Sequence, residues 1–250
     1  MKVLAVLVNY GEEQLHYLQQ VVNELKSFKK YEVFIVVHSN IPLDNIKGID
    51  ETFVVELEDY QLLPMTCRQT IDINSKDFDY YIFSENEHLW KEHHLDNYIK
   101  YESILPSDRI AGLIQYEENK TGRYYPAYHA HYEWDWDSVE EYGGKKFAHF
   151  TNIHQASFVL SRNKLAQIRD KHNFTQFFSN DHYSVKCKTN TDIYGHAGMK
   201  KVICISEFDS NLIHHLPNIY IDGGPGAVEY RVKQRSEENR MQAALTKLLK

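Results

Sequence analysis

The stretch that decides the fold is FDYYIFSENE, residues 78–87. Residues 80–83 form the short apolar run of a buried strand, and the run ends abruptly at Ser84, followed by Glu85 and Glu87. If the backbone stays extended, the two glutamates point to the same side. Paired carboxylates there can hold Mg²⁺ or Mn²⁺, because these ions take oxygen ligands and leave positions for a substrate diphosphate. The alternative is a solvated acidic turn.

Upstream of this stretch, strand and helix patterns alternate. Short apolar runs predict strands at residues 3–8, 31–37 and 52–57, and apolar residues at helical spacing predict helices at 15–25 and 66–73. Such alternation predicts an α/β fold with a mostly parallel sheet and helices on both faces. Ligands of such sheets bind at the carboxyl ends of the strands.

Downstream, the pattern is less regular. Residues 116–137 are rich in aromatic side chains and predict an irregular loop or a small sheet, whereas 156–160, 162–172 and 202–205 predict a strand, a helix and a strand. The tail, 228–250, is highly charged and predicts an amphipathic helix whose apolar face is Met241, Ala244, Leu245 and Leu248. Because no stretch has the composition of a linker, we expect a single domain.

Composition excludes several classes of protein. The net charge of −7 opposes a broad electrostatic grip on nucleic acid. The three cysteines are far apart and odd in number, which favours a reducing compartment. We see no secretion signal and no apolar run long enough for a membrane span, so we expect a soluble cytoplasmic protein. Phosphate-binding glycine loops, the serine-hydrolase elbow and the H-E-x-x-H zinc motif are all missing from the sequence.

Four further residues are candidates for chemistry. His214 and His215 are adjacent, so at most one should point into a site, and His214 is our choice; the alternative is one packed and one surface histidine. Asp181 and Asp192 are candidates for a general base, which must reach an acceptor hydroxyl. Asp192 has an alternative role as a helix N-cap, and Asp181 as a turn residue.

Three segments together resemble glycosyltransferases of the GT-A fold, family 2-like. VLVNYG at residues 6–11 is similar to their first strand and nucleotide loop, and FIVVHSN at 34–40 to their second strand, without the acidic pair often found there. Residues 78–87 resemble the strand with the D-x-D or E-D-D motif, here Glu-Asn-Glu. Residues 150–162 and 201–218 are similar to segments of uncharacterised viral and microbial sugar transferases.

The resemblance implies a fold, a reaction and a set of site residues. It implies one Rossmann-like GT-A domain over residues 1–227, with a nucleotide-sugar half at 1–100, an acceptor half at 101–227, and a charged helix at 228–250. It implies a hexosyl- or pentosyltransferase, metal-dependent and inverting, that uses a nucleotide-diphosphate sugar, with a UDP-sugar favoured, and a glycan or glycoconjugate acceptor. The alternative is a non-catalytic nucleotide- or carbohydrate-binding protein on a degenerate transferase fold.

The residues follow from the same resemblance. The implied nucleotide-sugar contacts are Asn9, Tyr10, Gly11, His38, Ser84 and Glu85. The implied ligands of Mn²⁺ or Mg²⁺ are Glu87, Glu85 and His214, and the implied base is Asp192 or Asp181.

Overall fold

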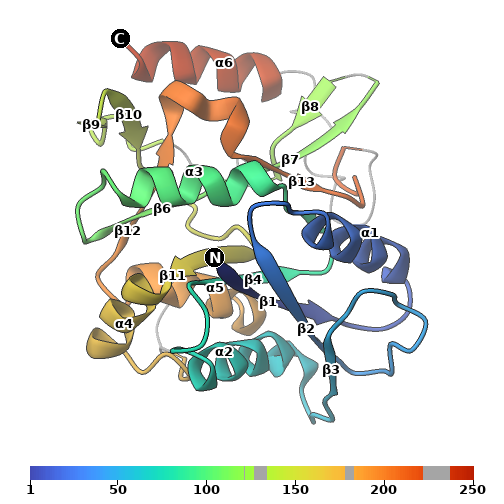
Figure 1. The fold of residues 1–250 in the computed structure, drawn as a ribbon. Helices are drawn as coiled ribbons and strands as arrows, with labels where there is room; N and C mark the ends of the chain where they lie inside the picture. Colours follow the sequence, from blue (N-terminus) through green and yellow to red (C-terminus); the bar gives the residue numbers. More distant parts are fainter. Residues whose placement is uncertain (121, 127–133, 178–182, 222–236) are drawn as a thin grey trace. The chain divides into compact units, whose positions relative to one another are not determined.

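The computed structural model describes residues 1–120, 122–126, 134–177, 183–221 and 237–250 (Figure 1). Two compact units are present, and each is built from two separate stretches of chain: residues 1–95 with 156–199, and residues 96–155 with 200–250. The predicted α/β class with sheets flanked by helices is confirmed. The predicted boundary near residue 100 falls close to the first passage between units, but the chain passes back at residue 156 and leaves again after 199.

A five-stranded sheet forms the centre of the first unit. Its order is β11 (Ser157–Ser161), β4 (Tyr80–Glu85), β1 (Lys2–Asn9), β2 (Glu32–Ser39) and β3 (Glu51–Val54). All neighbours are parallel except β11, which runs antiparallel to β4, so the predicted mostly parallel sheet is confirmed. In register, Val8 pairs with both His38 and Glu85, which brings the ends of three strands to one edge.

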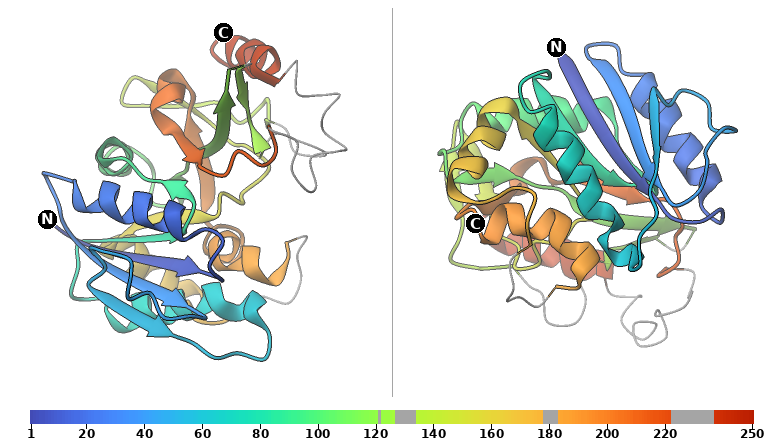
Figure 2. Two further views of the ribbon diagram at one scale, coloured as in Figure 1. Left: turned by 90° about the vertical axis from the view of Figure 1, so that its right-hand side faces the viewer. Right: turned by 90° about the horizontal axis from the view of Figure 1, so that it is seen from below.

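Helices cover both faces of this sheet, with α1 (Leu15–Lys26) on one face and α2 (Leu63–Ile73), α4 (Arg162–Lys171) and α5 (Val185–Gly195) on the other (Figure 2). Residues 3–7 of β1 are at most 1% exposed because both sides of the strand are covered. The buried face of α1 is Leu18, Val21, Val22 and Leu25, at the helical spacing read from the sequence.

Two predictions about this unit were wrong in detail. The third strand is short, ending at Val54 rather than 57, and it is exposed along its length as an edge strand. Helix α5 was not predicted, because its sequence, VKCKTNTDIYG, lacks amphipathic periodicity. Asp192 therefore lies inside a helix, and the interpretation of this residue as an N-cap is incorrect.

The second unit contains two groups of strands. One sheet has the order β6 (Arg109–Ala111), β12 (Lys200–Cys204), β10 (Lys145–Ala148) and β9 (Glu140–Tyr142). In the other group, β7 (Ile114–Asn119) lies between parallel β13 (Leu212–His215) and antiparallel β8 (Gly122–Tyr124). Helix α3 (Glu92–Glu102) leads the chain into this unit, and a 3₁₀ segment, Ile205–Asn211, connects β12 to β13.

The C-terminal helix α6 spans Glu237–Leu248. Its four predicted apolar residues, Met241, Ala244, Leu245 and Leu248, belong to a buried cluster of the second unit that also contains Trp134 and Phe150. The helix is therefore docked on a core, as its spacing suggested. No helix in the described part of the chain is both long and apolar enough to cross a membrane.

Candidate functional site

A pocket of about 600 Å³ opens at the carboxyl edge of the five-stranded sheet. The ends of β1 and β4, the segment just before α1, the loop between β3 and α2, the first residues of α2 and the start of α5 line it. Its lining residues are Val8, Tyr10, Glu13, Gln14, Glu58, Asp59, Tyr60, Gln61, Leu63, Pro64, Glu85, Asn86, Glu87 and Lys186. All of them belong to the first unit.

Glu85 and Glu87 both line this pocket. Glu85 is the last residue of β4, while Glu87 lies in the turn before the short strand β5 (His88–Leu89), so the extended backbone expected through residue 87 is not observed. The Glu85 amide donates to the carbonyl of Ala156 (3.1 Å). Ala156 has φ 50°, in the left-handed region that alanine seldom adopts, and such strained residues cluster at functional sites.

Two tyrosines stand together in the pocket wall. The rings of Tyr10 and Tyr60 lie 5.4 Å apart between centroids and are tilted by 53°, and Tyr10 is 63% exposed. Asp59 holds the turn that presents Tyr60, because its carboxylate accepts from the amide of Gln61 (2.9 Å). An exposed aromatic face beside a polar pocket suits stacking on a nucleobase or a sugar ring.

Asn9 ties the ends of three strands together beneath the pocket. Its side-chain amide donates to the Ser39 hydroxyl and to the Gly11 carbonyl, each at 3.1 Å, and its oxygen accepts from the amide of Asn86 (2.7 Å). Gly11 adopts φ +69°, and its amide donates to the Asn40 side chain (2.7 Å). Asn9 and Gly11, predicted as nucleotide contacts, are outside the pocket lining and instead fix the loops that form it.

His38 and Ser84, two more predicted nucleotide contacts, are buried and also outside the lining. Both ring nitrogens of His38 are engaged, by the hydroxyls of Thr66 (2.7 Å) and Thr70 (2.8 Å) on α2. Burial lowers the pKa of His38 from 6.5 to about 4, so the ring is neutral. The Ser84 hydroxyl donates to the Glu85 carbonyl (2.9 Å). Of the six predicted contacts, Tyr10 and Glu85 line the pocket.

Asp192, one of the two predicted bases, does not line the pocket. The side chains of Asp192 and Arg68 are 0% exposed, and Asp192 Oδ2 lies 3.8 Å from Arg68 Nη1. A base must reach an acceptor hydroxyl. Because Asp192 is buried beside Arg68, we interpret it as a structural residue. Asp181 lies outside the described residues.

His214 belongs to the second unit. Its ring stacks on Tyr116 at 4.9 Å between centroids, and its Nε2 lies 3.3 Å from Asn218 Oδ1. Among the described residues, no three or more His, Cys, Asp and Glu side chains gather as a metal-binding group. Of the three predicted metal ligands, the structure brings Glu85 and Glu87 to one pocket.

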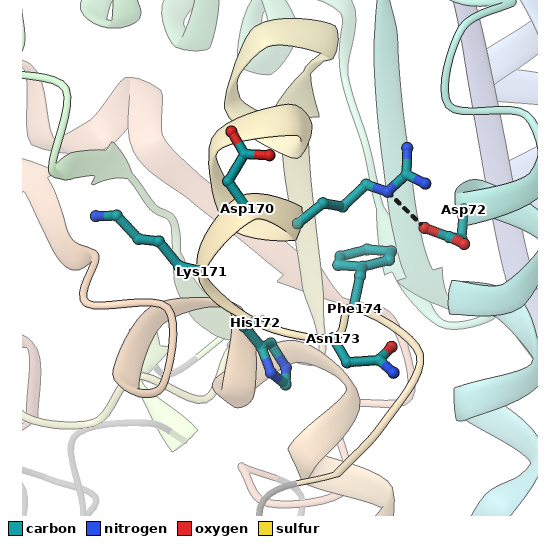
Figure 3. Close-up of a pocket in the computed structure, with 7 residues that line it drawn as sticks. Asp72, Asp170, Lys171, His172, Asn173 and Phe174 are labelled. Atoms are coloured by element: carbon teal, nitrogen blue, oxygen red, sulfur yellow. Dashed lines mark ion pairs between the residues drawn. The ribbon is translucent and has the colours of Figure 1, made fainter.

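A second pocket, of about 470 Å³, lies near the other end of α2 (Figure 3). Its wall includes the ion pair between Arg169 Nε and Asp72 Oδ1 (2.9 Å), together with His172 and Phe174. Pro64, in the first turn of α2, lines the larger pocket, whereas Asp72 lies in its last turn, about 12 Å further along the helix axis. Because α/β sheets bind ligands at the carboxyl edge, the larger pocket is the better candidate.

Sequence reasoning missed five charged or aromatic residues of the pocket. They are Glu13, Glu58, Asp59, Tyr60 and Lys186. Asp59 precedes a turn and a proline, which is a readable helix-start signal, and it points to Tyr60 as the residue presented there. Lys186 had no such signal, because α5 itself could not be recognised.

No protein-family model matches this sequence, and no curated protein matches it. The fold is similar to that of S. aureus TarS 1-349, a GT-A-type glycosyltransferase, with a TM-score of 0.50 and 12% identity over 100% of this chain and 71% of that chain. The complex of S. aureus TarS 1-349 with UDP-GlcNAc gives a TM-score of 0.48 and 12% identity over 86% of this chain and 58% of that chain. The longer S. aureus TarS gives a TM-score of 0.45 and 12% identity over 88% of this chain and 38% of that chain. The predicted GT-A fold is confirmed.

Proposed function

We propose that this protein is a glycosyltransferase that moves a sugar from a nucleotide-diphosphate sugar to an acceptor hydroxyl. The observation that supports this most directly is the pocket of about 600 Å³ at the carboxyl edge of a GT-A sheet, lined by Glu85, Glu87 and Tyr10. Its volume lies in the range of small-molecule sites. A fold alone hosts many reactions, so the proposal depends on this pocket rather than on the likeness of fold.

Glu85 and Glu87 fit a divalent cation. Mn²⁺ and Mg²⁺ bind carboxylate oxygens, and Mg²⁺ sites commonly use one or two carboxylates together with substrate phosphates. When bound, such an ion neutralises charge that develops on a leaving diphosphate. The two carboxylates would hold such an ion, and Asn9 fixes the Asn86 turn between them. A contribution from His214 stays a prediction.

The remaining roles follow from the shape of the pocket. Tyr10 and Tyr60 present aromatic faces for the base or the sugar of the donor. In a direct displacement, which inverts the anomeric centre, a carboxylate takes the proton of the acceptor hydroxyl while its oxygen attacks the sugar. Asp181 is our candidate for that base, a UDP-sugar for the donor and a glycan for the acceptor.

The first test is thermal unfolding with nucleoside diphosphates and nucleotide sugars, with and without Mn²⁺. A ligand at a hundred times its Kd adds about 2.7 kcal/mol of stability. We expect a metal-dependent rise in Tm with UDP, and its loss in Glu85→Gln and Glu87→Gln. Glu51→Gln is the matched control, because Glu51 is exposed on β3 and does not line the pocket.

Turnover separates a transferase from a binding protein. We expect release of the nucleoside diphosphate from a nucleotide sugar in the presence of an acceptor glycan. If nucleotide sugars stabilise the protein but no acceptor leads to release of the nucleoside diphosphate, the non-catalytic alternative is favoured. A protein that no nucleoside diphosphate or nucleotide sugar stabilises, with or without metal, would contradict a donor site in this pocket.

A further inference from the structure

The lining of the pocket is negatively charged, so a diphosphate needs a cation beside it in order to bind there. Its lining contains the carboxylates Glu13, Glu58, Asp59, Glu85 and Glu87, and Lys186 is the one cationic side chain among its described lining residues. A cleft lined by one sign of charge repels ligands of the same sign. A divalent cation on Glu85 and Glu87 would offset those two carboxylates and leave three facing an anionic ligand.

Lys186 occupies an unusual place for a cation. It is the second residue of α5, in the first helical turn, where the helix dipole disfavours positive charge. Its side chain is exposed and lines the pocket. A lysine at this position lowers the stability of the helix slightly. A role in ligand binding within the pocket would compensate for that loss.

The start of α5 lies close to the acidic end of β4. Both elements line the same pocket, α5 through Lys186 in its first turn and β4 through Glu85, its last residue. A diphosphate bound at Glu85 and Glu87 would therefore occupy the pocket that the Lys186 side chain lines.

We propose that Lys186 binds the diphosphate of the donor and stabilises the negative charge of the leaving nucleoside diphosphate, an assignment that rests on the proposed transfer function. In the transfer, the acceptor oxygen forms a bond to the anomeric carbon as the bond from that carbon to the β-phosphate oxygen breaks. The electron pair of the broken bond stays on the diphosphate, where the ammonium group faces it, and the acceptor proton passes to the carboxylate base. The ammonium group acts through its charge on the leaving diphosphate.

Calorimetric titration of the full chain with UDP and with inorganic pyrophosphate, both in Mg²⁺, tests the assignment. A charge-assisted contact to phosphate predicts that Lys186→Gln weakens both by about ten- to a hundredfold, while uridine binding is unchanged. Lys186→Arg should recover part of the affinity. The matched control is Lys188→Gln, on the same helix and outside the pocket lining. The Tm of Lys186→Gln should not fall, because no favourable dipole interaction is lost.

The rate of nucleotide release completes the test. We expect kcat of Lys186→Gln to fall about tenfold or more at saturating donor, because the contact strengthens as charge develops on the leaving group. If Lys186→Gln binds pyrophosphate and UDP as the wild type does, the assignment is wrong, although the transfer function stands. If the wild-type protein binds neither compound, the transfer function fails as well, and the assignment falls with it.

Discussion

Arg68 and Asp192 form an ion pair in the interior of the first unit, where neither side chain is exposed. Arg68 Nη2 also lies 3.2 Å from His172 Nε2, and its guanidinium stands 4.6 Å from the centre of the Phe174 ring. Burial lowers the pKa of Arg68 to about 10, and Asp192 opposes this shift, so the group stays charged at neutral pH. The two opposite charges therefore compensate each other in the interior.

Removing one partner of this pair should destabilise the fold. We expect Arg68→Met to lower the free energy of unfolding by about 3–5 kcal/mol, because Asp192 would be left as a buried charge. The double variant Arg68→Met with Asp192→Leu should regain most of this loss in urea unfolding. If Asp192→Asn instead keeps wild-type stability and loses turnover, Asp192 acts as the base and the structural role is wrong.

His38 makes stability dependent on pH. Its pKa in the folded protein, about 4, is below the ordinary 6.5, so the unfolded chain binds the proton more readily. The contribution of the neutral His38 ring to the free energy of unfolding is complete above pH 6.5 and is lost as the pH falls towards 4. Between pH 7 and 5 the wild type should lose about 2 kcal/mol more than His38→Gln. Equal slopes in urea unfolding of the two proteins would contradict this.

The site was only partly predictable at the scale of single residues. Tyr10, Glu85 and Glu87 lie at or just beyond the ends of buried strands and do line the pocket, as position alone suggested. His38 and Ser84 also lie near strand ends, those of β2 and β4, but are covered by the protein. The sequence shows which residues stand near a strand end, whereas packing of α2 against β2 decides which of them water can reach.

At the scale of elements, β7 and the chain after β13 are joined by one buried carboxylate. Glu117 Oε1 lies 2.6 Å from His215 Nδ1, and Glu117 Oε2 accepts from the amides of Tyr220 (3.0 Å) and Ile221 (2.7 Å). A carboxylate with two such amide donors is well satisfied without exposure to water. Glu117 thus fixes the turn that follows β13.

Loss of that charge should loosen the turn. We expect Glu117→Gln to cost about 1.5–3 kcal/mol, because its amide group cannot accept from both backbone amides and the histidine. Hydrogen exchange at Tyr220 and Ile221 should also quicken. The neighbouring Glu118→Gln is the control: Glu118 pairs with Arg123 at the surface (2.9 Å), and such pairs are worth about 0–1 kcal/mol. Similar losses in both variants would contradict a special role for Glu117.

Elements with strong periodicity were predictable, and elements without it were not. Strands β1, β2, β4 and β11 and helices α1, α2 and α4 were predicted within a few residues, since each has a continuous apolar run or a clear apolar face. Helix α5 has buried Thr189, Asn190 and Thr191 among its core residues, so its polar sequence hides its burial. With α5 hidden, Lys186 could not be connected with the acidic end of β4.

At the scale of the whole molecule, the sequence did not predict that each unit is built from two separate stretches of chain. The first ninety or so residues have one continuous α/β pattern, and the GT-A resemblance implied a donor half ending near residue 100. The first unit nevertheless draws β11, α4 and α5 from residues 156–199. Local periodicity has no information on such distant pairing, because the antiparallel match of β11 to β4 depends on complementary surfaces rather than on neighbours in the chain.

That pairing has a consequence for biosynthesis. A ribosome releases β1, β2 and β4 well before β11, and the edge of β4 that includes Phe83 has no strand beside it until residue 161 has emerged. An uncovered apolar edge is a template for association with other chains. The nascent chain must therefore pass through a long interval in which its first unit is incomplete, and rapid translation or timely chaperone cover during that interval would govern the yield of folded protein in a cell.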